Sequence, residues 1–452
     1  MNLDYVRLKQ LDHMYLWHPF TQMKEWMGED PCIIERGEGS YLIDIDGRKY
    51  LDGVSSLWCN VHGHCKPELD EALRSQLERV AHSTFLGLSN VSAIQFAEKL
   101  VAIVPAGLRR IFYSDNGATA VEVALKMAIQ YWQLRGEKER TRFVTLAEAY
   151  HGDTVGSMSL GYSETFHRFY RPLLFSALRI NPPHVFRYYQ CMSESEALAA
   201  AVKEAEDKIT QERESLAALI IEPFMQGAAG MWAQPLGYVK ALQKICRQHE
   251  IVLILDEVAT GFGRTGKMFA CEHDGVSPDI LCLAKGITGG YLPLAATLTT
   301  EEIFKVFLGE YDEFKSFFHG HTYTGNPLGC AVALANLDLF EREDILARMQ
   351  PRIGYLRQRL QQEFLPLAHV SDVRQWGFMV GIELVEDKAS RKGYVAGRRV
   401  GHKVIREARK HGVMIRPLGD VIILMPPLSI SDKELETLLD VTRDSIRLVT
   451  GS

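Results

Sequence analysis

The sequence predicts an α/β fold, in which a large domain with a mostly parallel sheet between helices is joined to a smaller α+β domain. Three observations support this prediction. Short, continuous apolar runs alternate with stretches of helical periodicity between about residues 65 and 325, which is typical of strands covered by helices on both faces. The last part of the chain mixes helical stretches with short strand-like runs. The length of 452 residues is sufficient for two or three domains.

The first 64 residues are expected to belong to the smaller domain. Residues 1–30 are expected to be partly helical and then irregular. In SYLIDIDGRKYLDG, two alternating runs flank Asp46 and Gly47. Alternating runs on either side of such a dipeptide predict a β-hairpin with a tight turn.

Residues 65–334 are expected to form the large domain, and residues 335–452 the smaller C-terminal one. The helices expected in the large domain are PELDEALRSQLERVAH, a helix from near Ala118 through VEVALKMAIQYW, and LGYVKALQKICRQHE. Its expected strands are RRIFYS, RFVTLAEAY, AALIIEP, IVLILDE and DILCLAK. The C-terminal domain is expected to contain the strands FMVGIEL and VIILMPP and the helix RRVGHKVIREARKHG.

The composition is that of a globular protein in a reducing compartment. The formal net charge is −6, with acidic and basic residues mixed, so neither a nucleic acid nor an anionic membrane is expected as a partner. The eight cysteines form no CxxC pair, which favours reduced thiols over disulfides or zinc. We find no apolar core of a secretory signal, and no apolar stretch of the roughly 20 residues that span a bilayer. These features predict a cytoplasmic protein.

Charged residues follow two of the apolar strands. Asp256 and Glu257 end IVLILDE, and Lys285 ends DILCLAK. Ligands of open α/β sheets bind at the carboxyl ends of the strands. A lysine with a depressed pKa can form an imine with a carbonyl, and a carboxylate beside it can hold a pyridine nitrogen protonated. The alternative is a structural ion pair between Asp256 and Lys285, and both interpretations remain open at this stage.

A helix start provides a candidate phosphate-binding site, in addition to Asp256 and Lys285. In SDNGATAVEVALKMA, the small residues Gly117 and Ala118 open a helix, whose first N–H groups and dipole attract anions. An ordinary capped helix start would give the same pattern. Together with a lysine and an acid at strand ends, the pattern favours a phosphorylated aldehyde cofactor. Tyr150 follows a strand and is expected either to stack on that cofactor or to pack in the core.

Two motifs suggest other functions but lack the required context. GFGRTG matches the dinucleotide fingerprint GxGxxG, but it does not directly follow a strand, no good helix follows it, and no acid-ended strand comes about 20 residues later. We expect this segment to be a flexible loop whose Arg264 points toward a site. The match to the fingerprint keeps a nicotinamide-dependent dehydrogenase as an alternative function. His319 and His321 resemble a metal-binding fragment, but no further ligands are suitably spaced.

The segments LILDEVATGFGRTGKMFACEH and LCLAKGITGGYLPLAA strongly resemble the class III aminotransferases of fold type I, and the resemblance extends through nearly the whole chain. It implies a seven-stranded type of sheet, a small domain built from both ends of the chain, and pyridoxal 5'-phosphate (PLP) as cofactor. Lys285 is then the lysine that binds PLP as a Schiff base, and Asp256 is the partner of the pyridine nitrogen. Tyr150 stacks on the ring, and Gly117 and Ala118 hold the phosphate.

The resemblance also implies a homodimer with shared active sites. The backbone at His321 and the hydroxyl of Thr322 are expected to reach the phosphate from the other subunit. Small-molecule amino donors and keto acceptors are the expected partners. The expected substrate-binding residues are Phe20, Leu57, Trp58, Tyr150, Arg264, Lys285, Gly320 and Arg416.

Within the class, WHPFTQM, DGVSSLWCNVHGH, AYHGDTVGSMS and FFHGHTYTGNPLGCAVA are similar to the branch that aminates 8-amino-7-oxononanoate in biotin synthesis. Phe20 stands where the branch using S-adenosylmethionine usually has tyrosine, and Leu57-Trp58 stands where it has a tryptophan pair. A lost hydroxyl and a lost aromatic face weaken recognition of a sulfonium, so lysine is slightly favoured over S-adenosylmethionine as donor. The alternative is an ω-amino-acid aminotransferase of the same class using pyruvate or 2-oxoglutarate.

Overall fold

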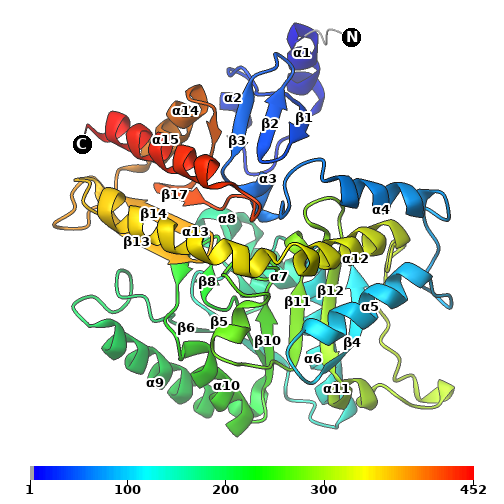
Figure 1. The fold of residues 1–452 in the computed structure, drawn as a ribbon. Helices are drawn as coiled ribbons and strands as arrows, with labels where there is room; N and C mark the ends of the chain where they lie inside the picture. The colour runs from blue at the N-terminus through cyan, green and yellow to red at the C-terminus, as the bar shows by residue number, and fades with distance from the viewer. Residues whose placement is uncertain (1–4, 452) are drawn as a thin grey trace.

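A seven-stranded sheet forms the centre of the computed structural model, which describes residues 5–451 (Figure 1). Its strands, in spatial order, are β4 (Leu108–Ser114), β12 (Ala295–Thr300), β11 (Ile280–Leu283), β10 (Val252–Asp256), β7 (Leu216–Ile221), β5 (Arg142–Leu146) and β6 (Leu178–Ile180). β12 runs antiparallel to both of its neighbours, and the pairs from β11 to β6 are parallel. The predicted mostly parallel α/β sheet is therefore confirmed.

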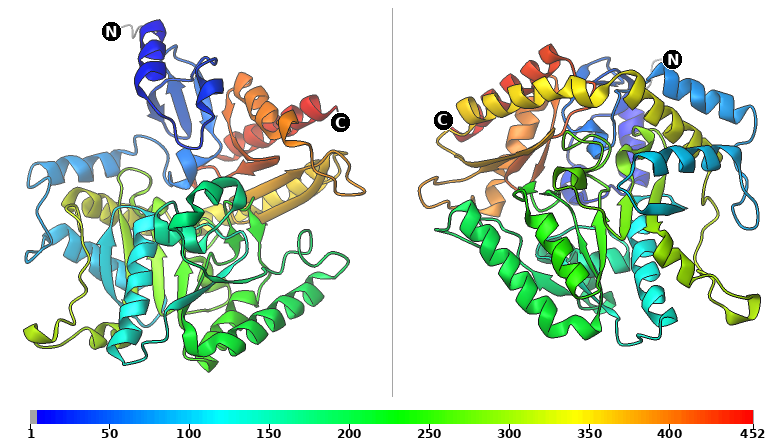
Figure 2. Two further views of the ribbon diagram at one scale, coloured as in Figure 1. Left: turned by 180° about the vertical axis from the view of Figure 1, so that it is seen from behind. Right: turned by 60° about the horizontal axis from the view of Figure 1, so that its bottom comes forward.

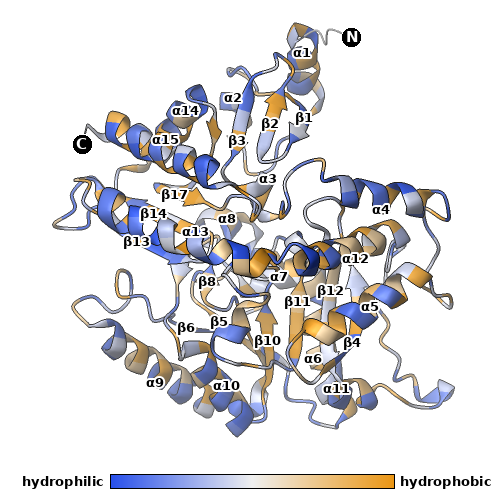
Figure 3. Cartoon of the chain, in the orientation of Figure 1, coloured by the Kyte–Doolittle hydropathy of each residue, from blue (hydrophilic) through white to orange (hydrophobic). Residues whose placement is uncertain are grey.

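Helices cover both faces of this sheet because its central strands are buried at every position and are apolar except for Asp256 at the end of β10. Successive side chains of a strand point to opposite faces, so Leu253 and Leu255 join one core cluster while Val252 and Ile254 join another. The first cluster includes residues of α5 (Val91–Ile103), α9 (Glu194–Glu212), α10 (Tyr238–Gln248) and α12 (Pro327–Arg342), and the second those of α6 (Gly117–Leu134). Figure 3 shows the apolar strands inside the layer of helices.

The two ends of the chain meet in a second, four-stranded sheet. β1 (Ile34–Glu38), β2 (Tyr41–Asp44) and β3 (Lys49–Asp52) are antiparallel, and β15 (Val413–Met414) pairs with β3. The β2–β3 pair is the predicted hairpin, and Gly47 in its turn has a φ of +82° that a glycine adopts without strain. Figure 2 shows this N-terminal unit standing beyond one end of the central sheet.

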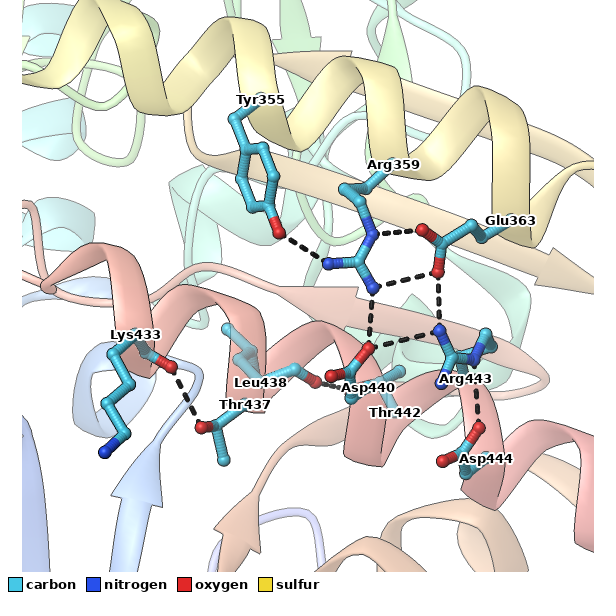
Figure 4. A network of polar contacts seen from close by, with 10 residues as sticks. All are labelled: Tyr355, Arg359, Glu363, Lys433, Thr437, Leu438, Asp440, Thr442, Arg443 and Asp444. Atoms are coloured by element: carbon cyan, nitrogen blue, oxygen red, sulfur yellow. Dashed lines mark hydrogen bonds and ion pairs between the residues drawn. The ribbon is translucent and has the colours of Figure 1, made fainter.

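A third sheet comes wholly from the C-terminal part, in the order β13 (Val370–Trp376), β14 (Met379–Leu384), β17 (Val421–Leu424) and β16 (Arg416–Leu418). The helices α13 (Ile345–Arg359), α14 (Val400–Lys410) and α15 (Asp432–Thr450) pack beside it. Arg359 and Arg443 share Glu363 and Asp440 in a network that ties the end of α13 to α15 (Figure 4). The domain limits at residues 64 and 334 stay predictions.

The shorter elements lie mainly in the connections. They are α1 (Tyr5–Tyr15), α2 (Met23–Trp26), α3 (Ser55–Trp58), α4 (Pro67–Leu77), α7 (Val155–Leu160), α8 (Glu164–His167), α11 (Glu301–Val306), β8 (Met225–Gln226) and β9 (Trp232–Ala233). Two predicted elements were too long: β5 ends at Leu146 and α4 at Leu77. Among residues 5–451, none of the helices combines the length and the apolar character that a membrane span requires.

Candidate active site

Asp256 and Lys285 lie at the carboxyl ends of the neighbouring parallel strands β10 and β11. Asp256 is the last residue of β10, and Lys285 opens a short 3-10 turn, Lys285–Thr288, two residues after β11. Within residues 5–451, the Lys285 ammonium has no carboxylate within ion-pair distance; its Nζ lies 5.0 Å from the centre of the Trp58 ring. The structural ion pair that the sequence left open is therefore absent.

The environment of Lys285 favours its neutral form. Burial lowers the pKa of the amine below its usual value, and the positive charge of Arg264 adds to that effect, while the nearby carboxylates of Asp256 and Glu222 oppose it. A neutral amine is a nucleophile and a base, whereas an ammonium is neither. The lowered pKa moves this amine in the direction that favours a nucleophile or a base.

Asp256 is a buried carboxylate fixed by two donors. Its Oδ2 is 2.7 Å from Nδ1 of the buried His151, and its Oδ1 accepts the N–H of Val258 at 3.0 Å. Each carboxylate oxygen can accept more than one hydrogen bond, so Asp256 keeps acceptor capacity for a further donor. His151, which follows Tyr150 in the chain, is a site residue to which the sequence assigned no role.

Glu222 is the second residue to which the sequence assigned no role. It follows β7, is buried, and accepts the N–H of Tyr150 at 3.0 Å and of Gly227 at 2.9 Å. Burial raises the pKa of this carboxyl to about 7, and the nearby negative charge of Asp256 adds to the increase. A charged group directly after an apolar strand was the available signal, as it was for Asp256.

The raised pKa of Glu222 predicts a pH dependence of stability. Below pH 4.5, its ordinary pKa, the carboxyl is protonated in both folded and unfolded chains. Between that pH and about 7 only the unfolded chain loses the proton, so stability falls as pH rises through this window, by a contribution on the order of 3 kcal/mol at most. Glu222→Gln has no titrating group at this position. We therefore expect the melting temperature of Glu222→Gln to rise relative to that of the wild type as the pH increases through this window.

Thermal unfolding of apoprotein at a series of pH values measures this effect. Glu214→Gln is the matched control, because Glu214 is exposed on the surface and should leave the pH profile unchanged. Parallel profiles for the wild type and Glu222→Gln would contradict the prediction.

Trp58 reaches Lys285 through an unusual left-handed turn. Ser55, Ser56, Leu57 and Trp58 have φ values of 50°, 50°, 82° and 71°, a conformation that is costly for residues with a Cβ. Hydrogen bonds hold the turn: Ser55 donates to the Met425 carbonyl, and Ser56 donates its N–H and Oγ–H to Asp52 at 2.9 and 2.7 Å. Backbone strain that the surroundings maintain is typical of functional sites. Trp58 is buried, whereas the neighbouring Leu57 side chain is 51% exposed.

Tyr150 is fixed at both ends. Its N–H is bound by Glu222, and its hydroxyl donates to Asp153 at 2.7 Å. Burial and the Asp153 carboxylate raise the pKa of this phenol, so it stays protonated. Its ring stacks with His167 at 6.5 Å between centroids, and the adjacent Phe166 meets Phe20 edge-on at 5.7 Å. The predicted residues Tyr150 and Phe20 are thus connected through α8, and Phe20 is 61% exposed.

The start of α6 offers free N–H groups. Its N-cap Asn116 accepts the N–H of Thr119, while the N–H groups of Gly117 and Ala118 make no hydrogen bond among the residues described. The backbone here is closely approached: a Cβ on Gly117 would lie 2.5 Å from Val258, and one on Gly152 would lie 2.4 Å from Ala118. The free amides therefore border the segments that carry Asp256 and Tyr150.

The loop before α12 lies outside the buried part of the site. Gly320 and Thr322 are exposed, and His321 is half-buried with Nδ1 at 3.3 Å from the Asp115 carboxylate. His319 instead lies 3.0 Å from Lys126. The two histidines therefore have different partners, and residues 5–451 contain no cluster of three or more potential metal ligands. Thr322 is available on the surface for contact with another molecule.

The two arginines of the predicted site differ sharply in exposure. Arg416 is exposed on β16 and has no ion-pair partner in the described part of the chain. β16 borders the cluster in which Trp58 packs with Leu418 and Val421. This arrangement brings Arg416 to the Trp58 side of the site with its guanidinium free.

Arg264 is 1% exposed and donates to the carbonyls of Pro426 and Asn60 at 2.7 and 2.6 Å. Burial lowers its pKa to about 10. The flexible loop predicted around Arg264 is wrong, because residues 260–265 are buried in the core. Its side chain holds two distant segments together, and a direct contact of Arg264 with substrate stays a prediction.

This fold and these residues define a class of enzyme. The family model of class III aminotransferases matches residues 23–446, and the chain belongs to this family. The proteins called adenosylmethionine-8-amino-7-oxononanoate aminotransferase from Nitratidesulfovibrio vulgaris and Aquifex aeolicus are 54% and 53% identical to it. The alignments cover 98% of this chain in both cases, and 82% and 98% of those proteins.

Solved structures agree with this assignment. The enzyme of the same name from Methanocaldococcus jannaschii is 49% identical with a TM-score of 0.93, over 98% of this chain and 99% of that one. An (S)-enantioselective omega-transaminase from Thermomicrobium roseum is 35% identical with a TM-score of 0.94, over 99% of each chain. The chain is thus an aminotransferase, and PLP is its cofactor; the dehydrogenase suggested by GFGRTG is excluded.

The residues present fit this cofactor. PLP needs an amine for its aldehyde, an anion for its ring nitrogen and donors for its phosphate. Lys285 supplies an amine without an ion pair, Asp256 a fixed carboxylate, and the start of α6 two unused N–H groups. Because Gly117 and Gly152 have no side chain, neighbouring groups can come close to the backbone at the start of α6.

Proposed function

We propose that this chain transfers an amino group to 8-amino-7-oxononanoate, producing 7,8-diaminononanoate for biotin synthesis. One observation carries the proposal. An unpaired Lys285 stands beside Asp256 at the ends of two parallel strands, in a chain about half identical over its length to enzymes named for this acceptor. The rival omega-transaminase function has weaker support, since such neighbours share less of the sequence.

Each residue is assigned a role by its contacts. Lys285 would hold the cofactor through its amine, and its Nζ, whose pKa burial lowers, would move the proton. Bound PLP supplies an electron sink for the carbanion that forms during amino transfer. Asp256 holds a proton on the ring nitrogen, and His151 keeps that carboxylate oriented. The N–H groups of Gly117 and Ala118 bind the phosphate.

The substrates are bound by the outer residues of the site. The free guanidinium of Arg416 binds a substrate carboxylate in a bidentate fork. The alkyl chain of the acceptor packs against apolar walls formed by Trp58, Leu57, Phe20 and Tyr150. Gly320 lines the channel through which the substrate enters. Because the two half-reactions use the same Lys285, ping-pong kinetics are expected.

We also propose a cytoplasmic homodimer, with His321 and Thr322 completing the phosphate site of the other subunit. The exposure of Thr322 and Gly320 on the loop before α12 supports this arrangement. A large apolar groove also lies on this side, with walls that include Phe112, Phe304 and Phe317. All eight cysteines are free thiols, as expected in a reducing compartment.

Two amino donors have support, and they come from different observations. The names of the relatives point to S-adenosylmethionine. Phe20, which is exposed and has no hydroxyl, and Leu57, which has no aromatic face, point to lysine. We expect wild-type protein to aminate 8-amino-7-oxononanoate with lysine more efficiently than with S-adenosylmethionine.

The assay compares kcat/KM for the two donors in the wild type and in Phe20→Tyr. The added hydroxyl should shift the ratio toward S-adenosylmethionine by about tenfold, the effect of a single hydrogen bond. Phe169→Tyr, which adds a hydroxyl to another exposed phenylalanine, one that lies beside Arg168, is the control. Amino transfer only to pyruvate or 2-oxoglutarate, with none to 8-amino-7-oxononanoate, would sink the proposed function.

A further inference from the structure

Asn336 makes three hydrogen bonds directly behind the turn that carries Lys285. It lies on α12 and is 0% exposed. Its side-chain nitrogen is 3.0 Å from the carbonyl oxygen of Gly286 and 3.1 Å from that of Ile287, and its Oδ1 is 2.8 Å from Nε2 of His62. Gly286 and Ile287 are the two residues that follow Lys285.

The chemistry of these groups fixes the orientation of each hydrogen. Carbonyl oxygens only accept, so the NH2 of Asn336 must face Gly286 and Ile287. Its Oδ1 can then only accept, so His62 must carry its proton on Nε2. Burial lowers the pKa of His62 to about 4, so this imidazole is neutral under ordinary conditions. The network thus has one stable arrangement, with both amide hydrogens committed to the lysine turn.

The lysine turn requires such support. Lys285 has a φ of +45°, and a residue with a Cβ adopts this left-handed region only where the surroundings hold it. Apart from the hydrogen bonds within the turn, the carbonyls of Gly286 and Ile287 are bound by the side chain of Asn336. Withdrawing these two donors would release the backbone that sets the direction of Nζ.

The same network connects the turn to the segment of Trp58. His62 lies four residues after Trp58, and the N–H of the adjacent Val61 donates to the carbonyl of Gly289 at 3.2 Å. A Cβ on Gly290 would lie 2.9 Å from the backbone of Asn60. The lysine turn, the Trp58 segment and α12 therefore meet at Asn336.

We propose that Asn336 and His62 are positioning residues that set the direction of the Lys285 amine relative to the Trp58 wall. They touch neither cofactor nor substrate and act through the backbone of residues 286 and 287. The inference rests on the proposed role of Lys285. It extends that role to a pair of residues 274 positions apart in the chain.

The main test compares the holoenzymes of the wild type, Asn336→Leu and the control Val332→Ala. Val332 is buried on the same helix in a cluster with Leu69 and Leu339, and the carbonyls of Gly286 and Ile287 are bound by Asn336 and not by Val332. For Asn336→Leu we expect kcat to fall about 10- to 100-fold, because an error of about 1 Å in placing a reacting group can have that effect. KM should change little. The pH midpoint of the absorbance of the bound cofactor should move by about half a unit or more.

His62 provides a second pair of variants should Asn336→Leu fail to fold. The amide nitrogen of His62→Gln lies as many bonds from the backbone as Nε2 and can donate to Asn336, whereas His62→Leu cannot. We expect His62→Gln to stay near the wild type and His62→Leu to show the loss in kcat and the shifted midpoint. Hydrogen exchange of residues 284–288 in the apoprotein should be faster in His62→Leu than in Val332→Ala.

Variants that lose thermal stability like Val332→Ala while keeping the wild-type kcat and midpoint would overturn the inference, because the network would then serve only packing. The absorbance and exchange measurements use no substrate, so they are independent of the identity of the acceptor. A wild-type protein that binds PLP without using Lys285 would instead overturn the proposed function.

Discussion

Replacing Lys285 with alanine should lower kcat for amino transfer by at least about 10³-fold. The variant loses both the amine that binds the cofactor and the base that moves the proton, and acid–base catalysis alone contributes about 10²- to 10⁴-fold. Lys285 forms no ion pair among the described residues, so its removal leaves no buried carboxylate without its only partner, and we expect the folded structure to persist. Steady-state kinetics with 8-amino-7-oxononanoate measure the effect, and the visible absorbance of the bound cofactor gives a separate signal.

Lys267→Ala is the matched control for this experiment. Lys267 is exposed in the segment after GFGRTG and, among residues 5–451, donates only to the carbonyl of Glu272, so its loss should leave kcat unchanged. Normal turnover by Lys285→Ala would show that the amine beside Trp58 has no part in the reaction. The assignment of the site would then be wrong, although membership in the family would stand.

The central sheet could be predicted from the sequence because its middle strands are almost entirely apolar. LAALII and ILCL have no polar face, a pattern that requires cover on both sides. The same runs located Asp256 and Lys285, since the first charged residue after each buried strand marks its end. The antiparallel direction of β12 could not be predicted, because the composition of a strand carries no information on its direction.

Tertiary contacts decide the features that the sequence did not reveal. The burial of Arg264 depends on the carbonyls of Asn60 and Pro426, which lie 204 and 162 residues away in the chain. An arginine between glycines is usually exposed, so the local pattern indicated a loop. Likewise, Asn336 lies within an apolar helix, and its role becomes visible only when the carbonyls after Lys285 are placed beside it.

Replacing Asp256 with asparagine should lower kcat by about 10²- to 10³-fold, the range found when one preorganised electrostatic group is removed. Asparagine is nearly the same size and can accept the hydrogen bonds of His151 and Val258 only through its single oxygen. The loss of the negative charge removes the stabilisation of a protonated ring nitrogen, and with it the electron sink. Because the carboxylate also raises the pKa of Lys285, the variant should have a lower pKa at this amine.

The pH profile separates this effect from simple misfolding. The limb that reports Lys285 should move to lower pH in Asp256→Asn, whereas a merely destabilised enzyme would keep its midpoint. Asp279→Asn makes the same chemical change at the opposite end of the same strands, where Asp279 accepts the N–H of Leu253 at 2.8 Å, and it should retain both kcat and midpoint. If Asp256→Asn matched the wild type in kcat, the ring nitrogen would not need this charge, and the carboxylate would serve only to hold His151.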